Sequence, residues 1–404
     1  MSKNARVRVN VAGSGVEAPL EFRPDVDGLR AVAIVMVVAF HLGVPGFGGG
    51  FVGVDVFFVL SGFLILRLLL KESEQTGSIH LAAFWARRAR RLLPAAAVVV
   101  FTVAIVAPII LPVALRVVGS QVIAAGTYLS NVYFQIASEE YFNDQTAGPL
   151  LHTWSLSVEE QFYVVIPLLL TIAIRGARPS DVRLRVGLLL LLIGVASVVG
   201  CEMLSRAGHI AAFYSAPARA WEFCAGGLIA VVEPYLRRPR LAAFTTAGTA
   251  LGIVLLVAAL ALSGGARFPG PVTGFAVVGT VSIIAGGVQP SRATRVLSFA
   301  VLQYIGRLSY SLYLVHWPIH VAMRLLVPDA PTGVGAVGAG LASGLAAVAL
   351  HRFVEKPLRF HPFFAQSPLR PLVAAVALAC VAVVAGIGLR TIAQCERRPK
   401  SGSF

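Results

Sequence analysis

The sequence predicts an all-α, polytopic integral membrane protein with about ten core transmembrane helices and an eleventh span near the C-terminus. Three observations support this fold class. Of the 404 residues, 57% are hydrophobic and only 13% are charged. The mean hydropathy is +0.80. The apolar residues form continuous runs of about 20, the length that an α-helix needs to cross a bilayer. A soluble domain has about 25% charged residues and could not bury so much apolar surface.

The candidate spans follow one another along most of the chain. They cover residues 26–46, 51–70, 94–114, 157–174, 186–204, 216–233, 241–262, 271–288, 299–326, 332–353 and 371–391. Residues 117–136 are also apolar but have no clear exit on the other side, so we expect a re-entrant or interfacial helix there. Glycine and proline are scattered without a period, which excludes collagen and coiled coil. The high hydropathy excludes disorder.

The basic residues report the orientation of the spans. The formal net charge is +15, and most of the 34 lysines and arginines fall in loops that share one side if the N-terminus is inside. The positive-inside rule then predicts a multi-pass protein of the inner (plasma) membrane, with a cytoplasmic N-terminus and an extracytoplasmic C-terminus. Membrane insertion accounts for the charge, so nucleic acid is not an expected partner and the lipid bilayer is. No cleavable signal peptide precedes the first span.

The expected organisation is a single membrane domain with short tails. We expect a cytoplasmic tail at 1–25, a transmembrane domain at 26–360, a linker with the eleventh span at 361–391, and an extracytoplasmic tail at 392–404. The four cysteines show no CxxC pair, so neither a metal site nor a disulfide framework is indicated. The sequence does not determine the oligomeric state.

Arg30 and His41 are ionisable residues within the first span. They are 11 positions apart, which on an α-helix is about 16.5 Å of rise and returns to nearly the same direction. They therefore share one face. Intramembrane ionisable residues are usually functional, and histidine is suited to act as a general base or to carry an acyl group itself. The alternative is that Arg30 snorkels to the interface and His41 is a packed, hydrogen-bonded residue.

Acidic residues open two other spans. Glu159 and Glu160 begin the fourth span, where either residue would orient or charge-balance a buried histidine. The alternative is that one of them stabilises the first turn of the helix. Asp55, near the outer end of the second span, has no basic partner nearby in the sequence.

Three further polar residues lie within later spans. Arg219 and Glu222 have the spacing of an intrahelical ion pair, so a structural role is favoured over a catalytic one. His316 lies mid-span in SYSLYLVHWP. A functional role and a hydrogen bond across helices are equally compatible with this position.

Four arginines stand close together in FWARRARRLLP, which we interpret as the inner loop between the second and third spans. They are Arg87, Arg88, Arg90 and Arg91. The guanidinium fork binds phosphate oxygens with two hydrogen bonds, so a cytosolic phosphate-bearing ligand such as a nucleotide-containing cosubstrate is one partner for them. Anionic lipid headgroups would satisfy the same cluster.

These motifs occur in an order that resembles the membrane-bound acyltransferase family 3, the O-acyltransferases of bacterial envelope glycans and secreted natural products. The matching segments are FRPDVDGLRAVAIVMVVAFH at 22–41, GGGFVGVDVFFVLSGFLI at 48–65, FWARRARRLLP at 84–94, PLLHTWSLSVEEQFYVVIP at 149–167, ARAWEFCAGGLIA at 218–230, IGRLSYSLYLVHWPI at 305–319 and FVEKPLR at 353–359. Together they run through almost the whole chain.

The resemblance implies roles for particular residues. In this family the arginine and histidine of the first span are regarded as essential, and they fall on Arg30 and His41. The arginine pair of the inner loop, here Arg88 and Arg91 beside Arg87, is thought to meet the acyl-CoA donor. Further motif positions fall on Ser61, Phe57, Phe58, Glu159 and Glu160.

The activity implied by the resemblance is transfer of a short acyl group, most simply acetyl, from acyl-CoA to a hydroxyl of a carbohydrate-containing acceptor. Acyl-CoA would be a cosubstrate, with no permanently bound cofactor and no metal. Asp55, Arg219, Glu222 and His316 would be supporting polar residues. A transporter that uses the intramembrane ionisable residues as a permeation or proton path is the alternative, and a catalytically silent scaffold is a third possibility.

One departure from the family pattern concerns the C-terminus. Many members continue after an eleventh span into an extracytoplasmic hydrolase-like domain, whereas this sequence ends shortly after that span. It is therefore either a stand-alone member or a truncated fusion. On this basis we expect small acceptors, such as glycolipids or glycosylated metabolites, as well as envelope glycans.

Overall fold

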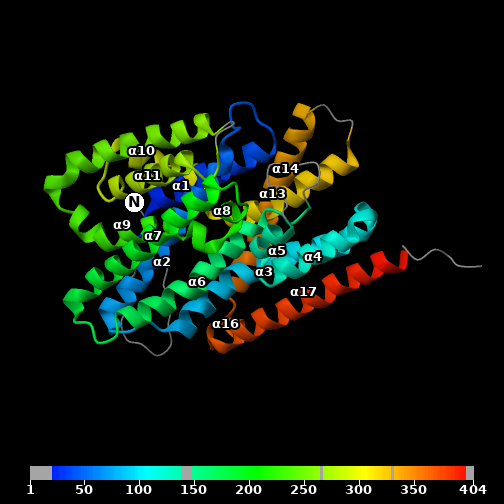
Figure 1. Ribbon diagram of the computed structural model, residues 1–404, viewed down its shortest axis with the longest axis horizontal. Helices are drawn as coiled ribbons and strands as arrows, with labels where there is room; N and C mark the ends of the chain where they lie inside the picture. The colour runs from blue at the N-terminus through cyan, green and yellow to red at the C-terminus, as the bar shows by residue number, and fades with distance from the viewer. Residues whose placement is uncertain (1–20, 138–147, 264–266, 329–331, 397–404) are drawn as a thin grey trace, which may run out of the picture.

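The computed structural model describes residues 21–137, 148–263, 267–328 and 332–396, and this part of the chain is helical and contains no strand. Figure 1 shows the helices. Their bounds are α1 Pro24–His41, α2 Gly53–Thr76, α3 Leu81–Ile110, α4 Leu115–Gly126, α5 Ser130–Ala137, α6 Thr153–Ala173, α7 Val182–Arg206, α8 Ala211–Tyr214, α9 Ala216–Leu236, α10 Ala242–Leu262, α11 Pro271–Gly286, α12 Arg292–Leu297, α13 Ala300–Leu326, α14 Thr332–Leu350, α15 Lys356–Arg359, α16 Pro362–Ala365 and α17 Leu369–Glu396. The all-α prediction is confirmed.

Within the described residues, seven helices are long and apolar enough to cross a membrane. They include α2, α3, α6, α7, α10 and α17, and a seventh runs through α14 and α15. Of the other predicted spans, α11 is a shorter apolar helix, and α1, α9 and α13, which carry polar and charged residues, are not among the seven. The coarse prediction of a polytopic helical membrane protein holds, whereas these criteria support fewer spans than the predicted ten or eleven.

The segment interpreted as an inner loop, residues 84–94, is helical instead. It forms the first part of α3, which begins at Leu81 and continues through Pro94. The segment is rich in alanine, arginine and leucine, all strong helix formers, which explains why it extends the apolar run that follows. The consequence is a fixed register for the arginines, since residues three apart lie on one helix face.

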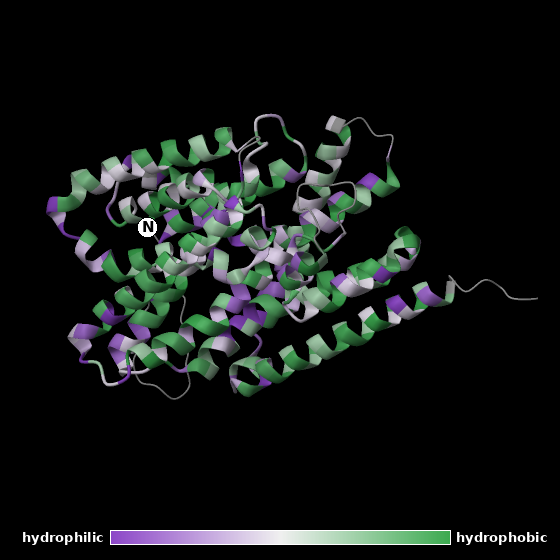
Figure 2. Cartoon of the chain, in the orientation of Figure 1, coloured by the Kyte–Doolittle hydropathy of each residue, from purple (hydrophilic) through white to green (hydrophobic). Residues whose placement is uncertain are grey.

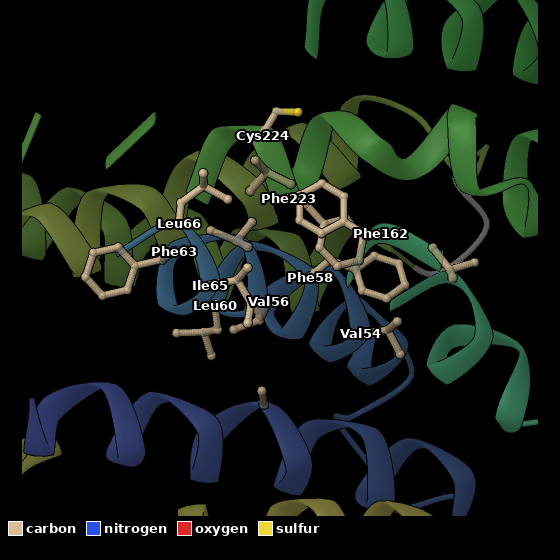
Figure 3. Close-up of a cluster of buried hydrophobic side chains, with 14 of the residues drawn as sticks. Val54, Val56, Phe58, Leu60, Phe63, Ile65, Leu66, Phe162, Phe223 and Cys224 are labelled. Carbon is tan, nitrogen blue, oxygen red and sulfur yellow. The ribbon is translucent and has the colours of Figure 1, made fainter. Parts of the chain in front are cut away.

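The centre of the molecule is formed by α1, α2, α9 and α13, with α6 beside them. Helix α2 packs along α9, and α1 packs along both α13 and α2. Figure 3 shows apolar side chains of α2 in this core, with Phe58 against Phe223 of α9, which also stacks on Phe162 of α6. Gly306 lets α13 approach α1 closely, because a Cβ there would collide with the carbonyl oxygen of Asp27.

The periphery carries the most apolar helices. Helix α17 lies along one side of the molecule and packs on α3 and α4, while α10 lies on the opposite side and packs on α11 (Figure 1). Figure 2 shows mostly green, hydrophobic ribbon along α17 and α10, and purple, hydrophilic ribbon near the centre and at the ends of helices. This distribution suits a protein whose outer surface faces lipid and whose interior holds the polar groups.

The segment predicted as a re-entrant or interfacial helix forms two short helices, α4 and α5. They meet at Tyr128, which has a left-handed backbone conformation with φ of 54°. The predicted tails at 1–25 and 392–404 lie mostly outside the described residues. Helix α1 begins at Pro24 with Asp25 and Asp27 in its first turn, as helix N-termini favour.

Candidate active site

Arg30 lines a small cavity between α1, α2, α3, α6 and α13, whose volume is about 70 Å³. Its guanidinium donates to Ser309 Oγ at 2.8 Å and lies 3.8 Å from an oxygen of Asp27. The other lining residues with polar side chains are Ser61, Arg88, Arg91, Ser155, Glu159, Tyr163, Ser309, Tyr310 and Tyr313. Apolar side chains that include Val54, Phe57, Phe58 and Leu60 complete the wall.

The helical register of α3 separates its four arginines. Arg88 and Arg91 line the cavity. Arg87 instead bonds Glu72 at 3.3 Å, and Arg90 reaches the carbonyl oxygen of Phe364 at 3.5 Å. Since residues three apart share a helix face, Arg88 and Arg91 reach the same space and the other two face away from it.

Arg88 and Arg91 form no ion pair within 4 Å among the described residues, although the carboxylate of Glu159 lines the same cavity. Their Nε atoms are buried and make no hydrogen bond. The Arg88 guanidinium lies over the ring of Tyr163, 4.2 Å from its centroid, which is a cation–π contact. Both side chains are half-buried, and a charge that is partly removed from water is stabilised by an anionic ligand. The two guanidiniums therefore form a ready site for an anionic group.

Glu159 is the acidic residue of this cavity. Its Oε1 accepts hydrogen bonds from the hydroxyls of Ser61 and Tyr163. Glu160 is not part of the lining. Because α6 begins at Thr153, neither glutamate lies in its first turn, so the predicted capping role is wrong. The helix starts earlier because Thr153, Trp154 and Ser155 already pack into the core.

His41 is the last residue of α1 and does not line this cavity. It is buried, with 4% of its surface exposed. Its Nδ1 lies 3.0 Å from Nε2 of His316 on α13, and its ring packs edge-on against Trp317, with centroids 4.7 Å apart. The prediction that Arg30 and His41 are aligned along one helix holds for their spacing, but the structure places them in adjoining environments and not in one cavity.

Tyr313 links these two environments. It lines the arginine cavity, and its ring centroid lies 5.4 Å from that of His316. The Tyr313 hydroxyl bonds Ser155 Oγ at 2.6 Å and the carbonyl oxygen of His152 at 3.0 Å. Tyr313 thus touches both the cavity that holds the arginines and the histidine pair.

Asp55, Arg219 and Glu222 form a separate cluster with no exposed surface. Arg219 pairs with Asp55 of α2, and its Nε lies 2.5 Å from Glu222 Oε1. The structure therefore contains the predicted intrahelical pair and supplies Asp55 with the basic partner that its own sequence neighbourhood lacks. The guanidinium is enclosed by the rings of Phe58, Trp154, Phe213 and Phe268, with centroids 5.4–5.9 Å away.

Comparison with known proteins identifies the family. The family model described as an acyltransferase domain, Acyl_transf_3, matches residues 23–389. The chain belongs to the acyltransferase 3 family. The resemblance expected from the motifs is thereby confirmed.

Curated relatives are similar over most of this chain. The peptidoglycan O-acetyltransferase OatA of Listeria monocytogenes is 32% identical over 355 residues, which cover 85% of this chain. The O-acetyltransferase OatA of Staphylococcus aureus is 31% identical over 358 residues, which cover 84%. The aligned part is 57% of the length of each relative. No solved structure gives a significant match.

In this acyltransferase 3 protein, sequence reasoning missed several residues of the site. Ser309 and Tyr313 were not predicted, although they stand seven and three residues before the predicted His316 in SYSLYLVHW, the spacing of one helix face. Tyr163 follows Glu159 by four positions. These helical spacings were the sequence signal that could have identified the residues in advance. The position of His152, just before α6, depends on its contacts with Leu314 and His316 of α13, which lie far away in the sequence.

Proposed function

We propose that this protein is a membrane O-acetyltransferase that moves a short acyl group from cytosolic acyl-CoA to a hydroxyl of a carbohydrate acceptor. The observation that carries the proposal is the pair Arg88 and Arg91, whose buried Nε atoms make no hydrogen bond in the described part of the chain, in a cavity that also holds Arg30. Acyl-CoA is polyphosphorylated, and arginine forks bind phosphate oxygens with two hydrogen bonds each. The names of the OatA relatives favour acetyl as the group and peptidoglycan as the acceptor class.

His41 is the proposed base of the transfer. It takes the proton of the acceptor hydroxyl while that oxygen attacks the thioester carbonyl carbon. The C–S bond then breaks, and the departing CoA sulfur receives the proton from the imidazolium. His41 follows Arg30 by 11 residues on α1, a rise of about 16.5 Å at 1.5 Å per residue, and the long flexible arm of CoA is able to span that distance. Transient acylation of His41 is the alternative route.

The remaining cavity residues prepare the donor site. The hydroxyls of Ser61 and Tyr163 hold the carboxylate of Glu159 in place in the cavity that the arginines line. The carboxylate keeps the local charge balanced until the anionic donor arrives. In this proposal the N-terminus is cytoplasmic, so that the arginine end of the bundle faces the pool of acyl-CoA, as the positive-inside rule favours.

The test uses the purified full chain in liposomes with acetyl-CoA and soluble peptidoglycan fragments. We expect release of CoA that depends on the acceptor, together with an acetylated fragment detected by mass spectrometry. His41→Ala should lower the rate by about 10²–10⁴-fold, the usual contribution of a general base. Arg88→Gln and Arg91→Gln should mainly raise the KM for acetyl-CoA, by about tenfold or more each, since hydrogen bonds to charged groups contribute about 1.5–3 kcal/mol.

Arg185→Gln is the matched control, because Arg185 is an exposed arginine on α7 whose hydrogen bond within the described residues is to the carbonyl oxygen of Arg175. It should leave the KM unchanged. Movement of a solute across the liposome without consumption of thioester would support the transporter alternative and contradict the proposal. CoA release that continues unchanged in His41→Ala would remove His41 from the mechanism.

A further inference from the structure

The histidine pair at the end of α1 has a defined hydrogen-bond direction. His316 Nδ1 lies 2.7 Å from the carbonyl oxygen of Tyr313 and 3.2 Å from that of Leu312. Carbonyl oxygens only accept hydrogen bonds, so His316 Nδ1 must carry a hydrogen. The Nε2 atom of neutral His316 then has a lone pair and no hydrogen.

This lone pair determines the state of His41. His41 Nδ1 lies 3.0 Å from His316 Nε2, and one of the two atoms must donate. Since His316 Nε2 is the acceptor, His41 Nδ1 carries the hydrogen, and the lone pair of neutral His41 is on Nε2. The ring centroids are 5.1 Å apart at an interplanar angle of 26°, as expected for two rings joined edge to edge through one N–H···N bond.

A third histidine fixes the ring of His316 from the other side. Pro318 lacks a backbone N–H, so the carbonyl oxygen of Leu314, four residues earlier, has no helical partner. His152 Nε2 donates to this oxygen at 3.1 Å, and the His152 ring stands edge-on to His316 with centroids 5.6 Å apart. The sequence WP after His316 thus creates the acceptor that holds His152 against it.

We propose that His316 is a positioning residue that holds His41 in the tautomer with its hydrogen on Nδ1, so that Nε2 is the atom that takes the proton of the acceptor hydroxyl. The inference rests on the proposed function, because it names the reacting atom of the same site. When His41 becomes an imidazolium, its Nδ1–H bond to His316 becomes charge-assisted and stronger. A histidine bonded to main-chain carbonyls thereby takes the place that a carboxylate has in a serine-protease triad.

Two substitutions of similar size separate positioning from packing. In His316→Gln the side-chain amide reaches the position of Nε2, and its oxygen accepts from His41 Nδ1. In His316→Asn the amide reaches only the position of Nδ1 and leaves His41 without this acceptor. We expect His316→Gln to retain kcat within about tenfold, and His316→Asn to lose about 10²-fold or more, with the KM for acetyl-CoA unchanged in both.

A spectroscopic measurement tests the tautomer directly. In ¹⁵N spectra of histidine-labelled protein in liposomes, protonated and bare ring nitrogens are well separated. The signals that disappear in His41→Gln should show a protonated Nδ1 and a bare Nε2. His152 provides the internal contrast, because it donates through Nε2 and has a buried Nδ1 without a partner in the described part of the chain.

The outcomes separate the two proposals. Equal loss of kcat in His316→Gln and His316→Asn, or a His41 signal with the hydrogen on Nε2, overturns the positioning role while acetyl transfer by the wild type stands. If the wild type transfers no acetyl group, the proposed function fails, and the spectrum still decides the tautomer. Retention in His316→Gln alone together with a protonated His41 Nδ1 supports the inference.

Discussion

The helices at the centre and at the edge of this molecule differ in what they bury. In the most apolar stretch of α2, 83% of the residues are buried, whereas the corresponding value for α17 is 17%. Both helices qualify as spans, so hydropathy alone does not distinguish the core from the lipid-facing surface. The candidate site lies among α1, α2, α3, α6 and α13, whose polar side chains face one cavity. Polarity within a span therefore marks the interior in this protein.

The largest effect should follow removal of a central charge. Arg219→Met leaves the carboxylates of Asp55 and Glu222 buried without a cation. We expect a loss of about 3–5 kcal/mol in stability, measured as earlier thermal loss of the monodisperse protein in detergent. Arg206→Met, at an exposed ion pair of α7, is the matched control and should change little. Equal loss of stability in Arg219→Met and Arg206→Met would contradict the idea that the buried ion pairs matter more than the exposed one.

A second variant of the Asp55, Arg219 and Glu222 cluster separates the effect of charge from that of packing. The triple variant Asp55→Asn, Arg219→Met, Glu222→Gln removes all three charges together. It should recover much of the stability that Arg219→Met loses, because no unpaired charge stays buried. A triple variant as unstable as the single one would show that packing of the guanidinium among its four aromatic rings is the dominant contribution.

Close helix contact at the centre predicts the next effect. Gly306→Leu places a side chain against the carbonyl oxygen of Asp27, where α13 meets α1. We expect a loss of about 1–3 kcal/mol from overpacking, with reduced acetyl transfer because α13 carries His316. Gly344→Ala on α14 is the control, since a Cβ there meets nothing within 4 Å. Thermal stability in detergent is measured for both variants. Equal stability would show that the close contact at Gly306 does not require a glycine.

Two substitutions of Tyr163 separate the contribution of its hydroxyl from that of its ring, and both effects should be smaller. Tyr163→Phe removes the hydroxyl that donates to Glu159 and keeps the ring beneath Arg88. Tyr163→Leu removes both. A cation–π contact contributes about 0.5–2 kcal/mol, so the KM for acetyl-CoA should rise further in Tyr163→Leu than in Tyr163→Phe, by about threefold to tenfold. Identical KM values in the two variants would exclude a role of the ring in holding Arg88.

The smallest effect is expected at the edge. Val384 on α17 is 70% exposed, so Val384→Ala should shift thermal stability in detergent by less than about 0.5 kcal/mol, as for most surface substitutions. Gly386→Leu on the same helix faces Gly119 of α4 and should cost more. Equal effects at the two positions would show that α17 does not dock through its glycine face.

Much of the fold and part of the site followed from local patterns. The apolar runs predicted helices, and the i,i+3 spacing predicted the Arg219–Glu222 pair. The extent of α3 did not follow, because an arginine-rich stretch before Pro94 has the appearance of a loop although its residues are good helix formers. The first-turn role of the glutamates was wrong because the start of α6 is decided by packing of Thr153 and Trp154.

By itself, the sequence determined that this is a polytopic helical membrane protein with ionisable residues inside its spans, because length, hydropathy and helical spacing are properties of neighbouring residues. The tertiary structure alone decided which polar groups meet. His41 bonds His316 across 275 positions, and Asp55 pairs with Arg219 across 164. Such contacts depend on which helices pack together, and no local period encodes that choice.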